Sequence, residues 1–317
     1  MDQLKWGVIG TIEKAKAFAN DLPYAQEEHI LTAIMSDEDN TPNASETNGL
    51  HLYTDLLEFL QSDIDAVYVA SPYHMHFAHV KQCLLHHKPV LCERPITEDG
   101  EELKYLMNLA ENNNTFMMEA MWLRFMPGIK KVLGIISSGI IGEIVSIKAS
   151  VNYDTTATTS QNISSDERDI LIELGTYPVF LCVLFLGKPD YVEGTSNITN
   201  KGSNEFFSAF LSYNESHYAF IEASSLNRGD SYVIIEGENG RVVIKNPWRP
   251  KPEDIEISFF DGTKTVQPVE WEGSGFQFEV DEVYKSLKEG YIESQLYCHH
   301  FNLDVIQTMD ELRLKLK

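Results

Sequence analysis

The sequence predicts an α/β protein of two domains: an N-terminal doubly wound parallel sheet, then a C-terminal α+β domain with a large, mostly antiparallel open sheet. Apolar strand patterns alternate with helical patterns over the first 120 residues, and right-handed crossovers would place the helices on both faces of a parallel sheet. After Pro127 the pattern changes to consecutive β-rich segments with short polar turns, which is typical of antiparallel pairing. A chain of 317 residues with 43% hydrophobic content is long enough for two separate cores.

The N-terminal domain is predicted over residues 1–121. It opens as a βαβ unit, with a buried strand at 5–10, a helix from about Glu13 to Asn20 and a second strand at 30–35. The patterns that follow predict a helix at 53–61, a strand at 66–70, a helix at 80–87 and a strand at 89–92.

The C-terminal domain is predicted over residues 122–317. A helix runs from Pro127 to about Ser138, and Gly139 ends it. Strands are predicted at 144–153, 206–213, 217–223, 232–236 and 241–244, and a final pair of helices at 276–288 and 300–316.

Composition excludes several classes of function. The formal net charge of −23 makes a polyphosphate backbone an unfavourable partner, which argues against nucleic-acid binding. The four cysteines match neither a zinc site nor a redox pair in their spacing, so we predict no metal. No apolar stretch approaches the roughly 20 residues of a membrane span. Residues 1–5 lack the features of a signal peptide, so we expect a cytoplasmic protein.

Three predicted strands are each followed directly by a polar segment whose residues could take part in binding or catalysis. The segments are Gly10-Thr11-Ile12-Glu13, Ser71-Pro72-Tyr73-His74-Met75-His76 and Glu93-Arg94-Pro95. Open α/β sheets bind ligands outside the carboxyl ends of their strands. The sequence therefore predicts a ligand site at this edge of the first sheet.

These segments, with the strand Lys5-Trp6-Gly7-Val8-Ile9-Gly10, resemble the glucose-fructose oxidoreductase and inositol dehydrogenase (Gfo/Idh/MocA) family. The run Met118-Glu119-Ala120-Met121-Trp122-Leu123-Arg124-Phe125-Met126-Pro127 is similar to the dihydrodiol dehydrogenase branch of that family. The family triplet is normally Glu-Lys-Pro, whereas this chain has Arg94 in place of the lysine. The resemblance implies a Rossmann dinucleotide-binding domain and an oxidoreductase that uses NAD(P).

The resemblance assigns a set of residues to the coenzyme. They are Gly7, Gly10, Thr11, Ile12, Ser36, Asp37, Ser71, Pro72, Tyr73, His76, Glu93, Arg94 and Trp122. Ile12 stands where the family has a glycine, and its β-branched side chain beside acidic Glu13 opposes close approach of a phosphate. A strand-to-helix turn that no longer binds nucleotide is the alternative at this position.

Acidic residues at the end of the second strand favour NAD over NADP. Carboxylates at Asp37 and Glu38 could accept hydrogen bonds from ribose hydroxyls and would repel a 2′-phosphate. A solvated acidic turn is the alternative interpretation of this segment.

Catalytic candidates come from both domains. The family lysine assists proton transfer, but a guanidinium stays protonated, so Arg94 can only donate hydrogen bonds and stabilise a developing alkoxide. The segment Asp169 to Pro178 resembles the family's Asp-Leu-Gly-x-Tyr helix, and its four-residue spacing would place Glu173 and Tyr177 on one helical face. Tyr177 is the acid/base candidate, with an ordinary packed tyrosine as the alternative. Arg124 is a candidate for substrate binding, or for an ion pair with Glu119.

The resulting hypothesis is hydride transfer between nicotinamide and a carbon that bears a hydroxyl or carbonyl on a sugar, polyol or diol. Arg94 and Tyr177 would contact this small-molecule substrate. The alternative is a catalytically degenerate member that senses a nucleotide or sugar without turnover. The resemblance also implies a homodimer, which we expect to form through the strands between Ile144 and Ile244.

Overall fold

The computed structural model describes residues 3–36, 50–152, 170–198, 204–214, 216–226, 229–248 and 254–316. The chain forms two compact units. The first contains Met1–Met126 and Glu272–Leu303, and the second contains Pro127–Trp271 and Asp304–Lys317. The predicted division into 1–121 and 122–317 differs from this packing, because residues 272–303 return to the first unit.

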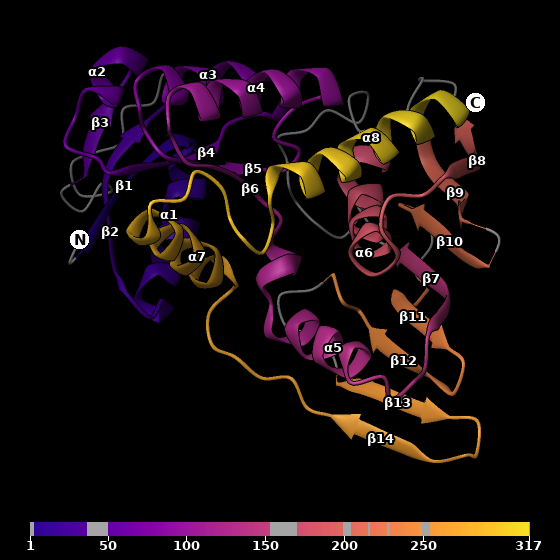
Figure 1. The fold of residues 1–317 in the computed structure, drawn as a ribbon. Helices are drawn as coiled ribbons and strands as arrows, with labels where there is room; N and C mark the ends of the chain where they lie inside the picture. The colour runs from indigo at the N-terminus through magenta and orange to yellow at the C-terminus, as the bar shows by residue number, and fades with distance from the viewer. Residues whose placement is uncertain are drawn as a thin grey trace. The chain divides into compact units, whose positions relative to one another are not determined.

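The first unit is built on six parallel strands in the order β3-β2-β1-β4-β5-β6 (Figure 1). Their bounds are β1 Gln3–Gly10, β2 Glu28–Met35, β3 His51–Tyr53, β4 Ala66–Ala70, β5 Val90–Glu93 and β6 Met117–Ala120. Every residue of β4 is buried, as expected for a strand covered on both faces by helices. The predicted doubly wound parallel sheet is confirmed.

The helices of the first unit begin in part at capping side chains, those of Thr11, Asp55 and Asp99. The helices are α1 Ile12–Asp21, α2 Leu56–Leu60, α3 His76–Leu85, α4 Gly100–Asn112, α7 Phe276–Glu289 and the start of α8 His299–Lys315, with short 3-10 turns η1 Leu22–Tyr24, η2 Tyr73–Met75 and η3 Trp122–Phe125. The predicted helix at 53–61 was wrong at its start, since Tyr53 ends β3. The Asp55 carboxylate accepts from the N–H groups of Leu57 and Glu58 at 2.8 and 2.9 Å, which fixes the start of α2.

Helix α7 belongs to the first unit because two buried or half-buried carboxylates bind its backbone and that of the segment after α1. Asp21 accepts from the N–H groups of Ser274 and Phe276 at 2.9 and 3.0 Å. Asp281 on α7 accepts from the N–H of Gln26 at 2.9 Å. The Phe276 ring also packs edge-on against Phe18, with ring centroids 5.8 Å apart.

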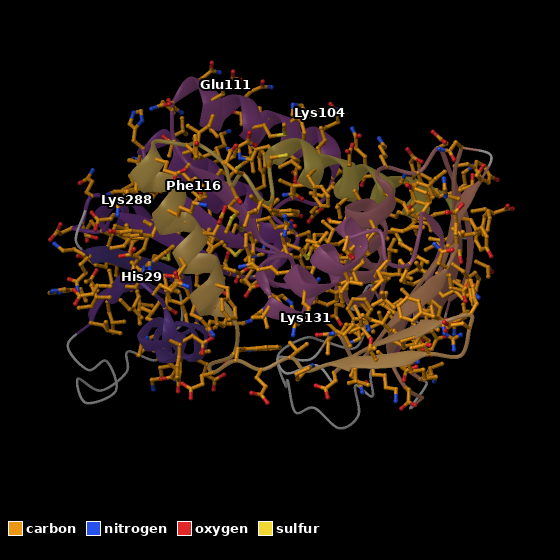
Figure 2. The ribbon with its side chains drawn as sticks, turned by 60° about the horizontal axis from the view of Figure 1, so that its bottom comes forward. His29, Lys104, Glu111, Phe116, Lys131 and Lys288 are labelled. Atoms are coloured by element: carbon orange, nitrogen blue, oxygen red, sulfur yellow. The ribbon has the colours of Figure 1, made fainter. Side chains whose placement is uncertain are left out.

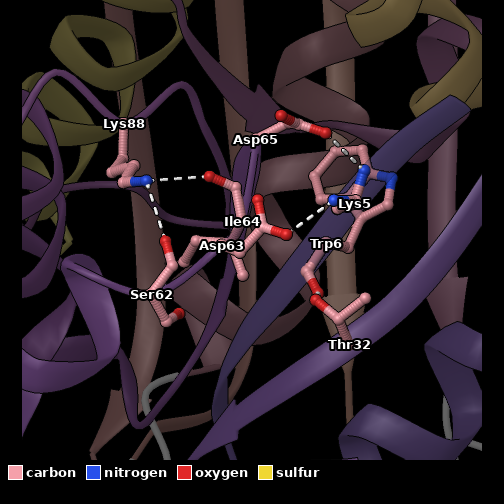
Figure 3. Close-up of polar contacts among 8 residues, drawn as sticks. All are labelled: Lys5, Trp6, Thr32, Ser62, Asp63, Ile64, Asp65 and Lys88. Carbon is pink, nitrogen blue, oxygen red and sulfur yellow. Dashed lines mark hydrogen bonds and ion pairs between the residues drawn. The ribbon is translucent and has the colours of Figure 1, made fainter.

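Polar contacts at the amino ends of β1 and β4 hold the opposite edge of this sheet (Figure 3). Lys5 pairs with Asp63 at 2.6 Å, and its backbone N–H donates to Asp65 at 2.9 Å. The Lys88 ammonium donates to the carbonyl oxygens of Ser62 and Ile64 at 3.3 and 2.8 Å. These contacts fix the start of β4, and they lie at the other end of the strands from the three segments predicted to bind a ligand.

In the first unit the charged side chains of the helices lie on the outer surface, and the apolar side chains lie in the core. Glu111 lies on the outer side of α4, while Phe116, 2% exposed, lies in the core just before β6 (Figure 2). Lys288, in the last turn of α7, lies over the ring of Tyr284 at 5.5 Å from its centroid. The long lysine side chain thus covers an aromatic surface while its charge faces water.

The second unit is built on eight strands in the order β14-β13-β12-β11-β7-β10-β9-β8. Their bounds are β7 Ile144–Asn152, β8 Tyr191–Ile198, β9 Asn204–Tyr213, β10 His217–Ser224, β11 Tyr232–Gly237, β12 Gly240–Lys245, β13 Ile255–Phe259 and β14 Lys264–Gln267. β7 and β10 are parallel, and the other neighbouring strands pair antiparallel. The predicted large, mostly antiparallel sheet is confirmed.

Helices cover one face of this second sheet. The described helices are α5 Pro127–Ser137, the π-helical turn η4 Leu171–Gly175, α6 Thr176–Leu186 and the end of α8. α6 packs against β7 and β10. The side chains of Ile147 and Ile221 on those strands are fully buried. Aromatic residues on the other side of the same strands, such as Phe220, remain exposed.

Candidate functional site

Strand order brings the three predicted segments to one edge of the first sheet. Gly10 at the end of β1 pairs with Ala70 at the end of β4, and Val69 pairs with Cys92 on β5. The turn after Gly10, the loop that starts at Ser71 and the triplet that starts at Glu93 therefore leave adjacent strands at their carboxyl ends. This is the position at which doubly wound sheets bind ligands.

The turn after β1 needs glycine at residue 10 for a packing reason. A Cβ added to Gly10 would lie 2.9 Å from the carbonyl oxygen of Ala70. Thr11 then caps α1, because its hydroxyl accepts from the N–H of Lys14 at 3.2 Å. Ile12 is the first residue of α1 and is half-buried. The strand-turn-helix geometry is thus present with isoleucine at this position.

Two of the residues predicted to bind coenzyme have packing or backbone contacts within the first unit. A Cβ on Gly7 would lie 2.5 Å from the ring of Phe59, so this glycine makes room for α2. The backbone N–H of Ser36 donates to the carbonyl of Tyr53 at 3.1 Å, which joins the end of β2 to β3. Asp37, also predicted to bind coenzyme, lies outside the described residues.

The loop after β4 is held from within. The hydroxyl of Ser71 and Nδ1 of His79 are 2.8 Å apart. His76 is 1% exposed, and both of its ring nitrogens lie 2.7 Å from backbone carbonyl oxygens, those of Pro95 and Ser71. Both ring nitrogens therefore face the protein, and the coenzyme contact of His76 stays a prediction. Pro72 and Tyr73 are exposed at the start of η2.

Glu93 is positioned by a tyrosine that sequence reasoning missed. The Tyr68 hydroxyl donates to the Glu93 carboxylate, and the Tyr68 ring is fully buried and stacked on Phe18 with centroids 4.6 Å apart. Burial and the adjacent Glu93 charge raise the pKa of Tyr68 well above its ordinary value, so the hydroxyl keeps its proton and stays a donor. A tyrosine inside the otherwise apolar run of β4 was the available signal.

Two further carboxyl groups lie buried near this triplet. Glu119 on β6 is 2% exposed and accepts from the Ile96 N–H and the Tyr297 hydroxyl, each at 2.8 Å. Glu279 on α7 is 1% exposed, and among the described residues its Oε1 has no hydrogen-bond partner. We call Glu93, Glu119 and Glu279 the carboxyl cluster.

Two members of the carboxyl cluster, Glu119 and Glu279, have raised pKa values. Burial raises the pKa of Glu119, although its two hydrogen bonds and the positive charge of Arg94 oppose the rise. Burial, and then the charges of Glu93 and Glu119, raise the pKa of Glu279 well above its ordinary value. Glu279 therefore holds a proton more tightly than an exposed glutamate does. Arg94, half-buried at the end of β5, is the cation beside this cluster.

The contacts of Arg124 bear on its predicted ion pair with Glu119. Arg124 in η3 donates from Nε to the carbonyl oxygen of Leu296 at 2.8 Å, and Glu119 takes its hydrogen bonds from other groups, so the structure does not place an ion pair between them. Burial lowers the pKa of Arg124, and the charge of Glu282 opposes this. Trp122, which begins η3, is half-buried.

The second unit holds Glu173 and Tyr177. Glu173 lies in the π-helical turn η4 and Tyr177 in the first turn of α6, so the single α-helix expected through both residues is corrected. Gly175 closes the π turn against β9, because an added Cβ would lie 2.8 Å from the ring of Phe207. Such turns occur frequently at functional sites. Residues 166–169, which replace the family's glycines, lie outside the described residues.

Tyr177 has an aromatic neighbour. Its ring centroid lies 5.8 Å from that of Trp248, at an interplanar angle of 31°. The Trp248 Nε1 donates to the Ser150 carbonyl at 3.2 Å, which fixes the orientation of the indole. Both rings are half-buried, so this pair retains accessible aromatic surface.

Comparison with known proteins agrees with this geometry. Residues 4–120 match the model of an oxidoreductase family with an NAD-binding Rossmann fold, and residues 129–243 match the GFO/IDH/MocA C-terminal domain. The chain belongs to the Gfo/Idh/MocA family of oxidoreductases. The family and branch indicated by the sequence motifs are confirmed.

Curated relatives of this family member match over nearly their whole length. A Bacillus subtilis scyllo-inositol 2-dehydrogenase (NADP(+)) is 28% identical, over 99% of this chain and 97% of the relative. A Xenopus laevis trans-1,2-dihydrobenzene-1,2-diol dehydrogenase is 26% identical, over 97% and 96%. A 3-ketoreductase from Actinomadura kijaniata, solved with NADP and TDP-benzene, superimposes with a TM-score of 0.86 at 21% identity over 99% and 98% of the two chains, a likeness of fold.

The described parts of the chain contain neither a membrane-spanning helix nor a cluster of metal ligands. No described helix has the length and apolar character needed to cross a membrane. No group of three or more histidine, cysteine, aspartate or glutamate side chains in those parts is arranged to hold a metal ion. The candidate site of the first unit is formed by the sheet edge, the carboxyl cluster and Arg94, while Glu173, Tyr177 and Trp248 lie in the second unit.

Proposed function

We propose that this family member is an NAD(P)-dependent oxidoreductase that transfers a hydride between nicotinamide and a hydroxyl- or carbonyl-bearing carbon of a sugar, polyol or diol. The observation that carries the proposal is the gathering of the Gly10 turn, the Ser71 loop and the Glu93-Arg94 turn at the carboxyl edge of one parallel sheet. The names of the relatives, an inositol dehydrogenase and a dihydrobenzenediol dehydrogenase, support a cyclic polyol or diol.

The residues present fit a dinucleotide. Gly10 ends β1 directly before the turn into α1, and the first N–H groups of a helix lack intrahelical partners and attract phosphate oxygens. When bound, nicotinamide would supply the hydride or accept it. Acidic Asp37 and Glu38 favour NAD in our proposal, although the Bacillus relative and a Hypocrea jecorina D-xylose 1-dehydrogenase are named as NADP(+) enzymes.

The proton and the developing charge fall to protein side chains. Arg94 would donate hydrogen bonds to the reacting oxygen and stabilise its negative charge as an alkoxide develops. Tyr177 would exchange the proton with that oxygen. Glu173 would orient one of these two groups, Arg124 would bind a polar group of the substrate, and the Tyr177–Trp248 pair would contact the apolar face of a ring.

The first experiment is titration of the full chain with NADH and with NADPH, followed by nicotinamide fluorescence. We expect NADH to bind more tightly than NADPH, and we then expect turnover with a panel of inositols, aldoses and cyclic diols. Absence of binding by either coenzyme would contradict the proposal. Binding without turnover of any substrate in the panel would instead favour the sensing alternative.

Two variants test the assigned roles. Arg94→Gln should lower kcat by about 100-fold while coenzyme affinity changes less, since the cation acts on the transition state. Tyr177→Phe should lower kcat by about 100-fold or more through loss of the proton donor. Tyr105→Phe, an exposed tyrosine on α4, is the matched control and should leave kcat unchanged.

We also propose that the protein forms a homodimer through the exposed face of the second sheet. Phe210, Tyr218 and Phe220 are 42%, 37% and 43% exposed on β9 and β10, and the Phe210 and Tyr218 rings are stacked at 5.8 Å. A contiguous aromatic surface of this kind is typical of an interface. Sedimentation should show a dimer at micromolar concentration, and Phe220→Glu should shift it to monomer; a monomeric wild type would contradict the proposal.

A further inference from the structure

His76 makes two hydrogen bonds that a neutral imidazole cannot make together. Its Nδ1 lies 2.7 Å from the carbonyl oxygen of Pro95, and its Nε2 lies 2.7 Å from the carbonyl oxygen of Ser71. A carbonyl oxygen only accepts hydrogen bonds, and a neutral imidazole carries a single N–H. Both short contacts are satisfied together only when both ring nitrogens are protonated.

We propose that His76 is a positioning residue that, as an imidazolium, joins the loop after β4 to the Arg94–Pro95 turn. The proposal rests on the proposed function, because it concerns the placement of Arg94 and of the loop assigned to the coenzyme. His76 lies at the start of α3, so its ring is anchored on a regular helix while its two partners lie on different loops. Through these two bonds the position of one loop fixes the position of the other.

The charges around the His76 ring determine the pH range in which it makes both hydrogen bonds. Burial lowers the pKa of His76, while the two carbonyl oxygens and the charge of Glu93, from β5, oppose the decrease; His74, from η2, adds to it when charged. The imidazolium therefore forms below the ordinary histidine value of 6.5. Above that pH one nitrogen presents a lone pair to a carbonyl oxygen, and we expect one of the two contacts to open.

His79, in the same helix, shows the contrast. Its Nδ1 faces the hydroxyl of Ser71 at 2.8 Å, and a hydroxyl can donate or accept. A neutral ring satisfies that contact in either tautomer. His76 therefore needs a second ring proton because both of its partners are carbonyl oxygens. His79, with a hydroxyl partner, does not.

Nitrogen NMR of the histidine rings tests the proposal without coenzyme or substrate. The full chain, labelled with ¹⁵N-histidine, is titrated from pH 8 to the lowest pH at which its near-ultraviolet circular dichroism stays native, and His76→Gln or His76→Asn, whichever folds, assigns the signal. We expect both His76 nitrogens to be protonated at the acidic end, with loss of one proton at a midpoint below 6.5. A single neutral tautomer over the whole range would overturn the proposal.

Coenzyme binding supplies the functional readout. The Kd for NADH should rise by about tenfold at most as the pH increases through the NMR midpoint, the scale of one hydrogen bond. His76→Gln should abolish this step, while His74→Gln, an exposed neighbour, should retain it. The same step in His76→Gln as in wild type would overturn the positioning role. If NADH does not bind at all, the proposed function fails, and the NMR titration still decides the protonation of His76.

Discussion

Replacing Glu279 with glutamine should make the protein more stable, and increasingly so as the pH rises. Glu279 lies on α7 with 1% exposure, and within the described residues its Oε1 has no hydrogen-bond partner. Burial and the charges of Glu93 and Glu119 raise its pKa well above the ordinary 4.5. Glutamine has the same shape as the protonated acid, so the variant keeps the packing and removes only the ability to lose a proton.

The sign and size of the effect follow from proton linkage. The folded state binds the Glu279 proton more tightly than the unfolded state, so this group's contribution to stability is complete below pH 4.5 and is lost as the pH rises toward the folded-state pKa. Over that interval wild type loses about 1.4 kcal/mol for each pH unit through this group. The variant has no proton to release there, so the difference in unfolding free energy should grow in its favour at the same rate.

Urea unfolding at pH 5, 6 and 7 at constant ionic strength measures this difference. Titrating groups that do not interact with Glu279 affect wild type and variant alike, so they cancel in the comparison. Glu289→Gln removes a carboxylate from the exposed end of the same helix and serves as the matched control, so that the contrast between the two variants isolates burial. A Glu279→Gln difference that stays constant from pH 5 to 7 would refute the reasoning and would mean that Glu279 is ionised in the folded protein.

Three further substitutions test contacts of the first unit, each by urea unfolding. Gly10→Ala should cost about 1–3 kcal/mol because its Cβ would lie 2.9 Å from the Ala70 carbonyl oxygen, which is backbone and has little freedom to move; an unchanged midpoint would mean that the turn is softer than its geometry indicates. Asp21→Ala should cost about 2–3 kcal/mol, since it leaves two backbone N–H groups at the start of α7 without their acceptor, and Asp21→Asn should recover part of the loss. Tyr297→Phe should cost about 1–3 kcal/mol because buried Glu119 loses one of its two donors, and a smaller loss would show that Asn302 or water replaces the hydroxyl.

The sequence was sufficient to predict β1, β2, β4 and β5 of the first sheet and the edge at which its polar segments meet, whereas the strands β3 and β6 were missed. Continuous apolar runs such as Ala66–Ala70 become parallel strands because both of their faces are covered, and the side chains that follow them must then lie at the carboxyl edge. The prediction failed at Tyr53. The apolar pattern there predicted the start of a helix, but Tyr53 ends a short strand. Asp55 decides the boundary there, through a capping geometry that periodicity does not encode.

The carboxyl cluster could not be predicted, because its members are distant in sequence and meet only when α7 returns to the first unit. Glu279 stands in an amphipathic helix, where a charged residue is normally assigned to the solvent face. Its burial depends on Asp21 and Asp281, whose carboxylates bind backbone N–H groups across more than 250 residues of sequence. The π-helical turn at Glu173 was missed for a related reason, since its geometry depends on the approach of Gly175 to Phe207 on another strand.

The carboxyl cluster gives a physical reason for the arginine in place of the family's lysine. A lysine acts as a base only when its surroundings favour the neutral amine, whereas nearby carboxylates favour the charged form. Arg94 lies where its charge acts on Glu119, beside Glu93. Arginine supplies the same permanent charge with a planar set of donors that can bind a carboxylate and a substrate oxygen at once. In the proposed reaction this assigns charge stabilisation to Arg94 and leaves proton exchange to Tyr177.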